Sequence, residues 1–200
     1  DDSSVVFVSS TTDNAFYKVT GSGTSVSQIG SGLPYKPIAL QIKGNNNGNP
    51  NDDLIYVGVG ASGVYKSTDS GSNFSAINNG LPSSKNITFL AMSQADSNYL
   101  YVTSMNSTWI YYSHNGGANW YYPSSTDVKN ADGWVCGSQE GFDYDAGVDC
   151  FNSYVIAHPT NRDIALVVGS GQIIKKTADG GSNWRYSCTG KTGGGASIRV

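Results

Sequence analysis

A short motif occurs three times in this chain and constrains its architecture more than any other feature. The copies read Ser-Thr-Asp-Ser-Gly-Ser-Asn-Phe at 67–74, Ser-His-Asn-Gly-Gly-Ala-Asn-Trp at 113–120 and Thr-Ala-Asp-Gly-Gly-Ser-Asn-Trp at 177–184. A motif that recurs every few tens of residues indicates a repeat architecture, in which each copy marks one supersecondary unit. The chain is therefore expected to fold as a series of similar units.

The spacing of the copies suits units of four β-strands. The first two copies start 46 residues apart, and the second and third start 64 residues apart. A fourth, eroded copy lies upstream, because residues 16–34 align without a gap on residues 64–82, at an offset of 48, with ten of nineteen positions identical. Steps of about 40–50 residues match one blade of a β-propeller, and the longer step equals one blade plus an insertion.

The chemistry of the motif predicts a tight turn between two strands. An Asp or Asn side chain can accept hydrogen bonds from backbone N–H groups just downstream, and the Ser or Thr two residues earlier can support it. The Gly supplies a positive φ, and the aromatic residue covers the turn. We therefore predict structural rather than catalytic roles for the motif residues Ser67, Asp69, Gly71, Phe74, Ser113, Asn115, Gly117, Trp120, Thr177, Asp179, Gly181 and Trp184.

This pattern resembles the Asp-box, or bacterial neuraminidase repeat, of sialidases, sortilin-type receptors and family 74 glycoside hydrolases. The resemblance covers nearly the whole chain, and the runs at 54–60, 63–74 and 80–82 look most like blades of family 74 endo-glucanases and xyloglucanases. It implies a β-propeller in which each box closes the turn between the third and fourth strands of a blade, remote from the central site. The same box serves enzymes, receptors and assembly factors, so it indicates the fold and not the function.

The remaining apolar runs predict an all-β chain of sixteen strands. The runs at 5–9, 54–58, 99–103 and 164–168 precede the boxes, and those at 37–42, 87–92, 153–157 and 196–200 suit a blade's innermost strand. The expected blades cover about 1–36, 37–82, 87–126 and 153–190, with an insertion at about 123–152 and a closing strand at 196–200. Four blades' worth of strands could close a small ring or belong to a larger one. We favour the larger ring, because the resembling families use six or more blades.

The composition predicts a secreted protein. Only 14% of the residues are charged and the net charge is −3, which argues against a nucleic-acid partner. No run of apolar residues is long enough for a membrane-spanning helix. The sequons at Asn73, Asn86 and Asn106 could carry N-glycans.

The three cysteines also suit an oxidising compartment, because no metal-type Cys/His spacing accompanies them. A disulfide between Cys136 and Cys150 would close a loop of about 15 residues and contribute about 3 kcal/mol. Cys188 is then left without a partner, but sequence cannot order the three pairings.

The insertion is the one place where the repeat is broken, and three interpretations of it stay open. Asp143, Asp145 and Asp149 alternate around a glycine, as the oxygen ligands of calcium loops do, although no cofactor is required by the fold. Alternatively, carboxylates beside aromatic rings could form a sugar site, with stacking by Trp134, Phe142 and Tyr144. The third interpretation, which we favour, is a disulfide-pinned surface loop with solvated acids.

Two functions remain for the chain as a whole. The first, which we favour slightly, is a secreted, glycosylated module without catalytic activity that binds a polysaccharide, a cell-surface glycan or a protein, or that assembles with itself. The alternative is a segment of a secreted family 74-like hydrolase, which would cleave β-1,4-glucans with inversion by two Asp residues. No Asp of this chain can be matched to that catalytic pair. A sialidase is not expected, because the arginines Arg162, Arg185 and Arg199 do not suit a triad that grips a carboxylate.

Overall fold

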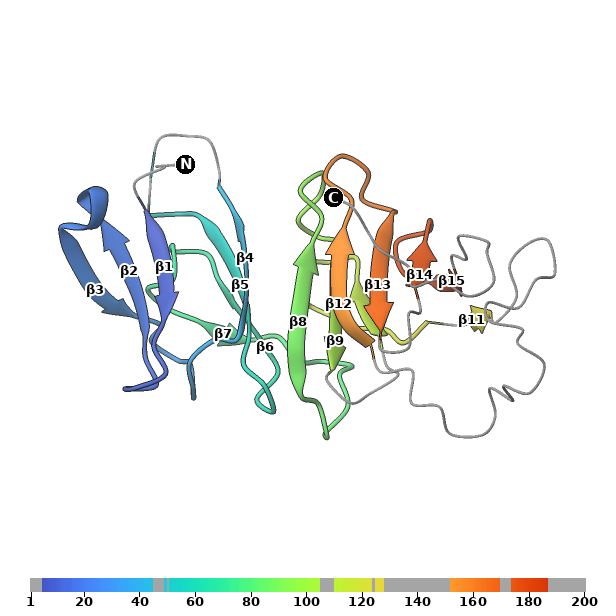
Figure 1. The fold of residues 1–200 in the computed structure, drawn as a ribbon, viewed down its shortest axis with the longest axis horizontal. Coiled ribbons are helices and arrows are strands. Elements are labelled where there is room, and N and C mark those ends of the chain that lie inside the picture. Colours follow the sequence, from blue (N-terminus) through green and yellow to red (C-terminus); the bar gives the residue numbers. More distant parts are fainter. Residues whose placement is uncertain are drawn as a thin grey trace, which may run out of the picture.

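The computed structural model describes residues 5–44, 49, 51–104, 110–123, 125–127, 152–169 and 174–186. These residues form four small β-sheets that follow one another along the long axis of the molecule (Figure 1). No helix of the described residues is long and apolar enough to cross a membrane.

The first two sheets are antiparallel meanders. The first contains β1 (Val6–Ser9), β2 (Phe16–Thr20) and β3 (Ser25–Ile29), with the 3-10 helix η1 (Gly21–Gly23) between β2 and β3. The second contains β4 (Ala39–Lys43), β5 (Leu54–Gly58), β6 (Val64–Ser67) and β7 (Ser75–Ala76). Each strand pairs with the next along the chain, as the hairpin signals in the sequence predict.

The other two sheets repeat the arrangement with small variations. The third contains β8 (Ile87–Met92), β9 (Leu100–Ser104) and β10 (Ile110–Ser113). The fourth contains β12 (Asn152–Ala157), β13 (Ala165–Gly169), β14 (Ile174–Thr177) and β15 (Asn183–Tyr186), together with β11 (Ser125–Asp127). The expected all-β fold class is therefore confirmed.

Two details differ from the expected order of strands. The fourth strand of the third unit is reduced to one antiparallel bridge, between Tyr112 and Tyr121. β11 lies at the end of the expected third unit, yet it pairs in parallel with β15 of the following sheet. Alternation of apolar residues indicates strands but does not show which neighbouring strand a short polar segment joins. The pairing of β11 with β15 could therefore not be predicted from the sequence.

The core of the described residues is divided into three clusters, and each cluster lies between two consecutive sheets. Phe16 of the first sheet packs with Ile55 and Val57 of the second. Tyr56 on the opposite face of the second sheet packs with Leu100 of the third, and the third sheet continues this pattern against the fourth. Because successive residues of a strand point to opposite faces, an inner sheet can pack apolar residues on both sides.

Candidate functional site

The first box turn is held by its own side chains. Ser67 Oγ donates to Asp69 Oδ1 at 2.7 Å and accepts from the backbone N–H of Gly71 at 2.9 Å. Asp69 then accepts from Asn73 twice, through the backbone N–H at 2.9 Å and through Nδ2 at 2.8 Å. Gly71 has a φ of 87°, a conformation that residues with a side chain rarely adopt. The polar side chains of Ser67, Asp69 and Asn73 therefore bond within the turn itself.

The other two boxes repeat this geometry almost atom for atom. Thr177 and Asp179 make the same set of bonds, including both contacts from Asn183. In the middle copy, Asn115 accepts the backbone N–H of Asn119 at 2.9 Å. Asn115 has one side-chain oxygen rather than two, and the Asn119 side chain instead accepts a bond from Asn79 at 2.6 Å. An acceptor, and not a charge, is what this position needs.

The surroundings of the box carboxylates favour their ionised forms. The backbone N–H of Asn73, then Ser67 and the Asn73 side chain, lower the pKa of Asp69 below its ordinary value of 3.8. At Asp179, burial opposes ionisation, but the bonds from Asn183 and Thr177 outweigh it, so the pKa is again lowered. A carboxyl group with a lowered pKa stabilises the fold at neutral pH.

The two box aspartates should therefore make stability sensitive to acid. Their contribution is present above the unfolded-state pKa near 3.8 and is lost as pH falls through the lower folded-state pKa. We expect the urea midpoint of the double variant Asp69→Asn/Asp179→Asn to fall less than that of the wild type between about pH 5 and pH 2. Asn115→Asp is the matched control and should make the fall steeper. Parallel pH profiles for all three proteins would contradict this account.

Each box also makes backbone contacts with the segment that follows the last strand of the preceding sheet. We call this segment the connector. The first connector, residues 30–34, accepts a bond at Ser31 O from the N–H of Phe74 at 2.8 Å. The second, residues 78–82, accepts at Asn79 O from the N–H of Trp120, also at 2.8 Å. Before the third box, β11 takes the corresponding place beside β15. The connectors therefore join consecutive sheets through the box turns.

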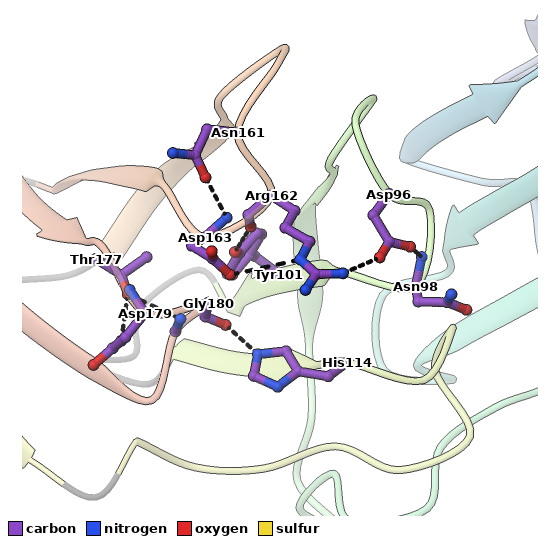
Figure 2. A network of polar contacts seen from close by, with 11 residues as sticks. Asp96, Asn98, Tyr101, His114, Asn161, Arg162, Asp163, Thr177, Asp179 and Gly180 are labelled. Atoms are coloured by element: carbon purple, nitrogen blue, oxygen red, sulfur yellow. Dashed lines mark hydrogen bonds and ion pairs between the residues drawn. The ribbon is translucent and has the colours of Figure 1, made fainter.

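A polar network crosses from the third sheet to the fourth beside the last box (Figure 2). His114 Nε2 lies 2.7 Å from Gly180 O, which requires the ring nitrogen to donate, and the His114 ring stacks on Tyr99 at 4.3 Å. Tyr101 Oη donates to Arg162 O at 2.8 Å. Because these groups bond across the boundary between two sheets, we interpret the network as an interface between sheets and not as a reaction centre.

The charged members of this network form an ion pair at the surface. Arg162 Nη1 lies 2.9 Å from Asp96 Oδ2, and its guanidinium lies 4.8 Å from the centre of the Tyr99 ring. Burial opposes ionisation of Asp96, but Asn98 and Arg162 outweigh it, so the pKa of Asp96 is lowered. The aspartate is thus a charged partner for arginine and is poorly suited to donate a proton.

The most ligand-like surface of the described residues is a pair of tyrosines around β10, which we call the tyrosine rim. It consists of Tyr111 and Tyr122, whereas Tyr112 and Tyr121 pair on the opposite face of the sheet, where Tyr112 packs toward the fourth sheet. The Tyr111 and Tyr122 rings lie 5.6 Å apart, edge to face, and Tyr122 is 51% exposed. Tyr111 is partly buried, and burial and then Tyr122 raise its pKa, so its hydroxyl stays protonated at neutral pH. An exposed ring held by a fixed neighbour is a suitable stacking surface.

Tyr111 also lines a small hollow next to the rim. The lining residues are Pro82, Lys85, Ile87, Val102, Thr103, Ser104 and Tyr111. The exposed wall of this hollow is apolar, and Thr103 is buried. The hollow has room for about one water molecule, so it extends the apolar surface beside Tyr111 and is not itself a ligand pocket.

The other predicted site residues fall in two groups. Asn73 and Asn86 are exposed, and Nδ2 of Asn73 is the atom that bonds Asp69. Several predictions lie outside the described residues: the sequon Asn106, the cysteines Cys136, Cys150 and Cys188, the calcium candidates Asp143, Asp145 and Asp149, and the stacking candidates Trp134, Phe142 and Tyr144. Within the part of the chain that the structure describes, no three His, Cys, Asp or Glu side chains gather as metal ligands would.

Sequence reasoning missed the connectors and the tyrosine rim. The Gly-Leu-Pro repeat at 32–34 and 80–82 was visible, and it signalled a repeated contact whose partner only the structure shows. The aromatic runs around Tyr111 and Tyr121 were visible too, but alternation alone does not tell a packed ring from an exposed one.

Solved structures with β-propellers are similar to this one over most of the chain. An ancestral GH74 enzyme superimposes with a TM-score of 0.62 and 19% identity, over 91% of this chain and 22% of that one. The outer coat vertex of COPII on membranes gives 0.56 and 11%, over 86% and 42%. The GH74 xyloglucanase from Xanthomonas campestris gives 0.45 and 14%, over 88% and 34%. The chain thus spans less than half of each of these proteins.

These similarities confirm the β-propeller-like fold that the repeat predicts. No known family model matches the sequence. No curated protein matches it either. At these identities the likeness concerns the fold alone, and a fold of this kind supports many functions.

Proposed function

We propose that this protein is a secreted β-propeller module that binds glycan chains through the tyrosine rim without cleaving them. The observation that carries the proposal is the exposed Tyr122 ring, held edge to face by Tyr111, which itself lines a small apolar hollow. A sugar ring has an apolar C–H face and polar hydroxyl edges. Its apolar face can therefore stack on Tyr122 while its hydroxyl groups stay in contact with water.

The carboxyl groups support binding rather than hydrolysis. A glycosidase needs one carboxylic acid with a raised pKa to protonate the leaving group. Among the described carboxyl groups, shifts at Asp13, Asp69, Asp96 and Asp179 are all downward, and each has a hydrogen-bonding partner that explains it. These groups therefore act as charged acceptors within the fold.

Removing the exposed ring should weaken binding. For Tyr122→Ala we expect a Kd for cellohexaose or a xyloglucan oligosaccharide about tenfold higher than that of the wild type, which corresponds to about 1.4 kcal/mol. Isothermal titration calorimetry measures this directly. Tyr35→Ala is the control, because Tyr35 is 62% exposed but lies between β3 and β4, outside the third sheet that carries the rim. Equal affinities for the wild type and Tyr122→Ala would refute the proposed site.

The second candidate is a segment of a family 74-like endo-β-1,4-glucanase. Its support is the superposition on an ancestral GH74 enzyme over 91% of this chain. This candidate predicts that incubation of the protein with xyloglucan releases new reducing ends. It also predicts that Tyr122→Ala releases the same amount of reducing ends as the wild type, if catalysis lies away from Tyr122. The binding proposal predicts no release by either protein.

A further inference from the structure

The register of the strands identifies equivalent positions in the four sheets. In the last three sheets, the box Ser or Thr lies opposite Ile55, Leu100 or Ala165 on the neighbouring strand. In the first sheet, Val19 occupies the box Ser position in the gapless alignment, and it lies opposite Val6. Val6 is therefore the equivalent of Ile55, and Val8, two residues on, is the equivalent of Val57.

These equivalent positions are buried in three sheets and exposed in one. Ile55 and Leu100 are 0% exposed and Ala165 is 1% exposed, because each packs on the sheet before it. Val6 is 54% exposed, and Val8 is 43% exposed. Val19 in turn lies opposite Val26 of β3, and Val26 is 62% exposed. We call this row of valines on the first sheet the valine face.

The fourth sheet leaves its other face exposed, the face that in the third sheet packs on the following sheet. Ala91 in the third sheet lies opposite Tyr101 and is 4% exposed, because it packs on the fourth sheet. Its equivalent in the fourth sheet is Ile156, which lies opposite Leu166 and is 49% exposed. We call this surface the Ile156 face, and it lies at the other end of the row of sheets (Figure 1).

We propose that a second copy of this chain docks head to tail, with the Ile156 face of one copy on the valine face of the other. The three internal interfaces each join these two kinds of face, so the chain already shows how they pack. Among the described residues, only the two end sheets leave such a face uncovered, and a second copy supplies the missing half of each. Two copies bring together eight sheets, within the range of about four to eight blades of known rings, and a two-fold axis can close them.

This inference rests on the packing of the sheets and not on glycan binding, so either proposal can fail without the other. It predicts a molar mass of twice 21.1 kDa for the chain at high concentration by light scattering after size exclusion. Dilution should shift the mass toward that of one chain. A monomer at every concentration up to the millimolar range would overturn the proposal.

Two blocking variants test the direction of docking. Val6→Asp/Val8→Asp blocks the valine face, and Ile156→Asp blocks the other end. These side chains are exposed in the single chain, so each variant should keep the wild-type melting temperature when measured as a dilute monomer. Each variant alone should be monomeric, whereas a one-to-one mixture should form a dimer through the one intact pair of faces.

The mixture separates this arrangement from a symmetric contact between like faces. If two valine faces paired with each other, Ile156→Asp would remain dimeric, and mixing the two variants would form no additional dimer. This result would contradict head-to-tail docking. Tyr35→Asp is the control for added charge, because Tyr35 is exposed but lies on neither end face. It should associate as the wild type does.

Discussion

Replacing Trp120 by alanine is expected to lower the free energy of unfolding by about 3–5 kcal/mol, the usual loss for a buried tryptophan. Trp120 is 3% exposed and packs in the cluster between the second and third sheets. Its Nε1 also donates to Ile77 O at 2.6 Å. The variant therefore leaves a cavity and an unpaired carbonyl at the same interface, and urea unfolding followed by circular dichroism measures the loss.

Trp120→Phe is the matched control, because the first box has Phe74 at the equivalent position, 6% exposed. Phenylalanine keeps most of the packing but loses the bond to Ile77, so we expect a loss of about 1–2 kcal/mol. A loss below about 1 kcal/mol for Trp120→Ala would mean that the box aromatic residues do not hold the sheets together.

Replacing Gly80 by alanine should have the next largest effect. Gly80 has a φ of 92°, and an added Cβ would lie 2.1 Å from the carbonyl oxygen of Trp120. The added methyl group would thus clash with the backbone of Trp120. Relieving the clash would break the hydrogen bond from Trp120 N–H to Asn79 O, which joins the connector to the box. We expect a loss of about 2–4 kcal/mol, from the unfavourable φ and from overpacking together.

Gly23 separates these two contributions. Its φ is 91°, but nothing lies within 4 Å of an added Cβ. Gly23→Ala should therefore show only the conformational part, about 1 kcal/mol, in the same urea titration. Equal losses for Gly80→Ala and Gly23→Ala would show that the close approach of connector and box contributes nothing to stability.

The local chemistry of the fold was readable from the sequence because it is contained in a few consecutive residues. Ser67, Asp69 and Asn73 are close together in the chain, and their hydrogen bonds follow from the reach of short side chains. Strand positions could be predicted for the same reason, since a short continuous apolar run such as 54–58 indicates a strand buried on both faces.

Contacts between sheets were much harder to predict. The bond from Trp120 to Ile77 spans 43 residues, and the bond from His114 to Gly180 spans 66. Periodicity within one strand carries no information about such partners. The reduction of the third sheet's last strand to the Tyr112–Tyr121 bridge depends on the same long-range packing.

The candidate binding surface illustrates this limit most clearly. Tyr112 and Tyr122 are close in sequence and identical in chemistry, but Tyr112 lies against the Gly181 backbone whereas Tyr122 is exposed. Only the three-dimensional arrangement distinguishes a ring that joins two sheets from a ring that can meet a ligand. The function is thus proposed from exposure and neighbours, and not from the repeat.

The most direct test of the proposed function is one titration in which binding and cleavage are read from the same sample. A xyloglucan oligosaccharide is added to the ¹⁵N-labelled protein, amide shifts are followed by NMR, and the sugar is then sized by mass spectrometry. We predict reversible shifts around Tyr111 and Tyr122 with an oligosaccharide of unchanged length. Shortened oligosaccharides, or shifts that avoid the tyrosine rim, would contradict a non-catalytic glycan-binding role for this surface.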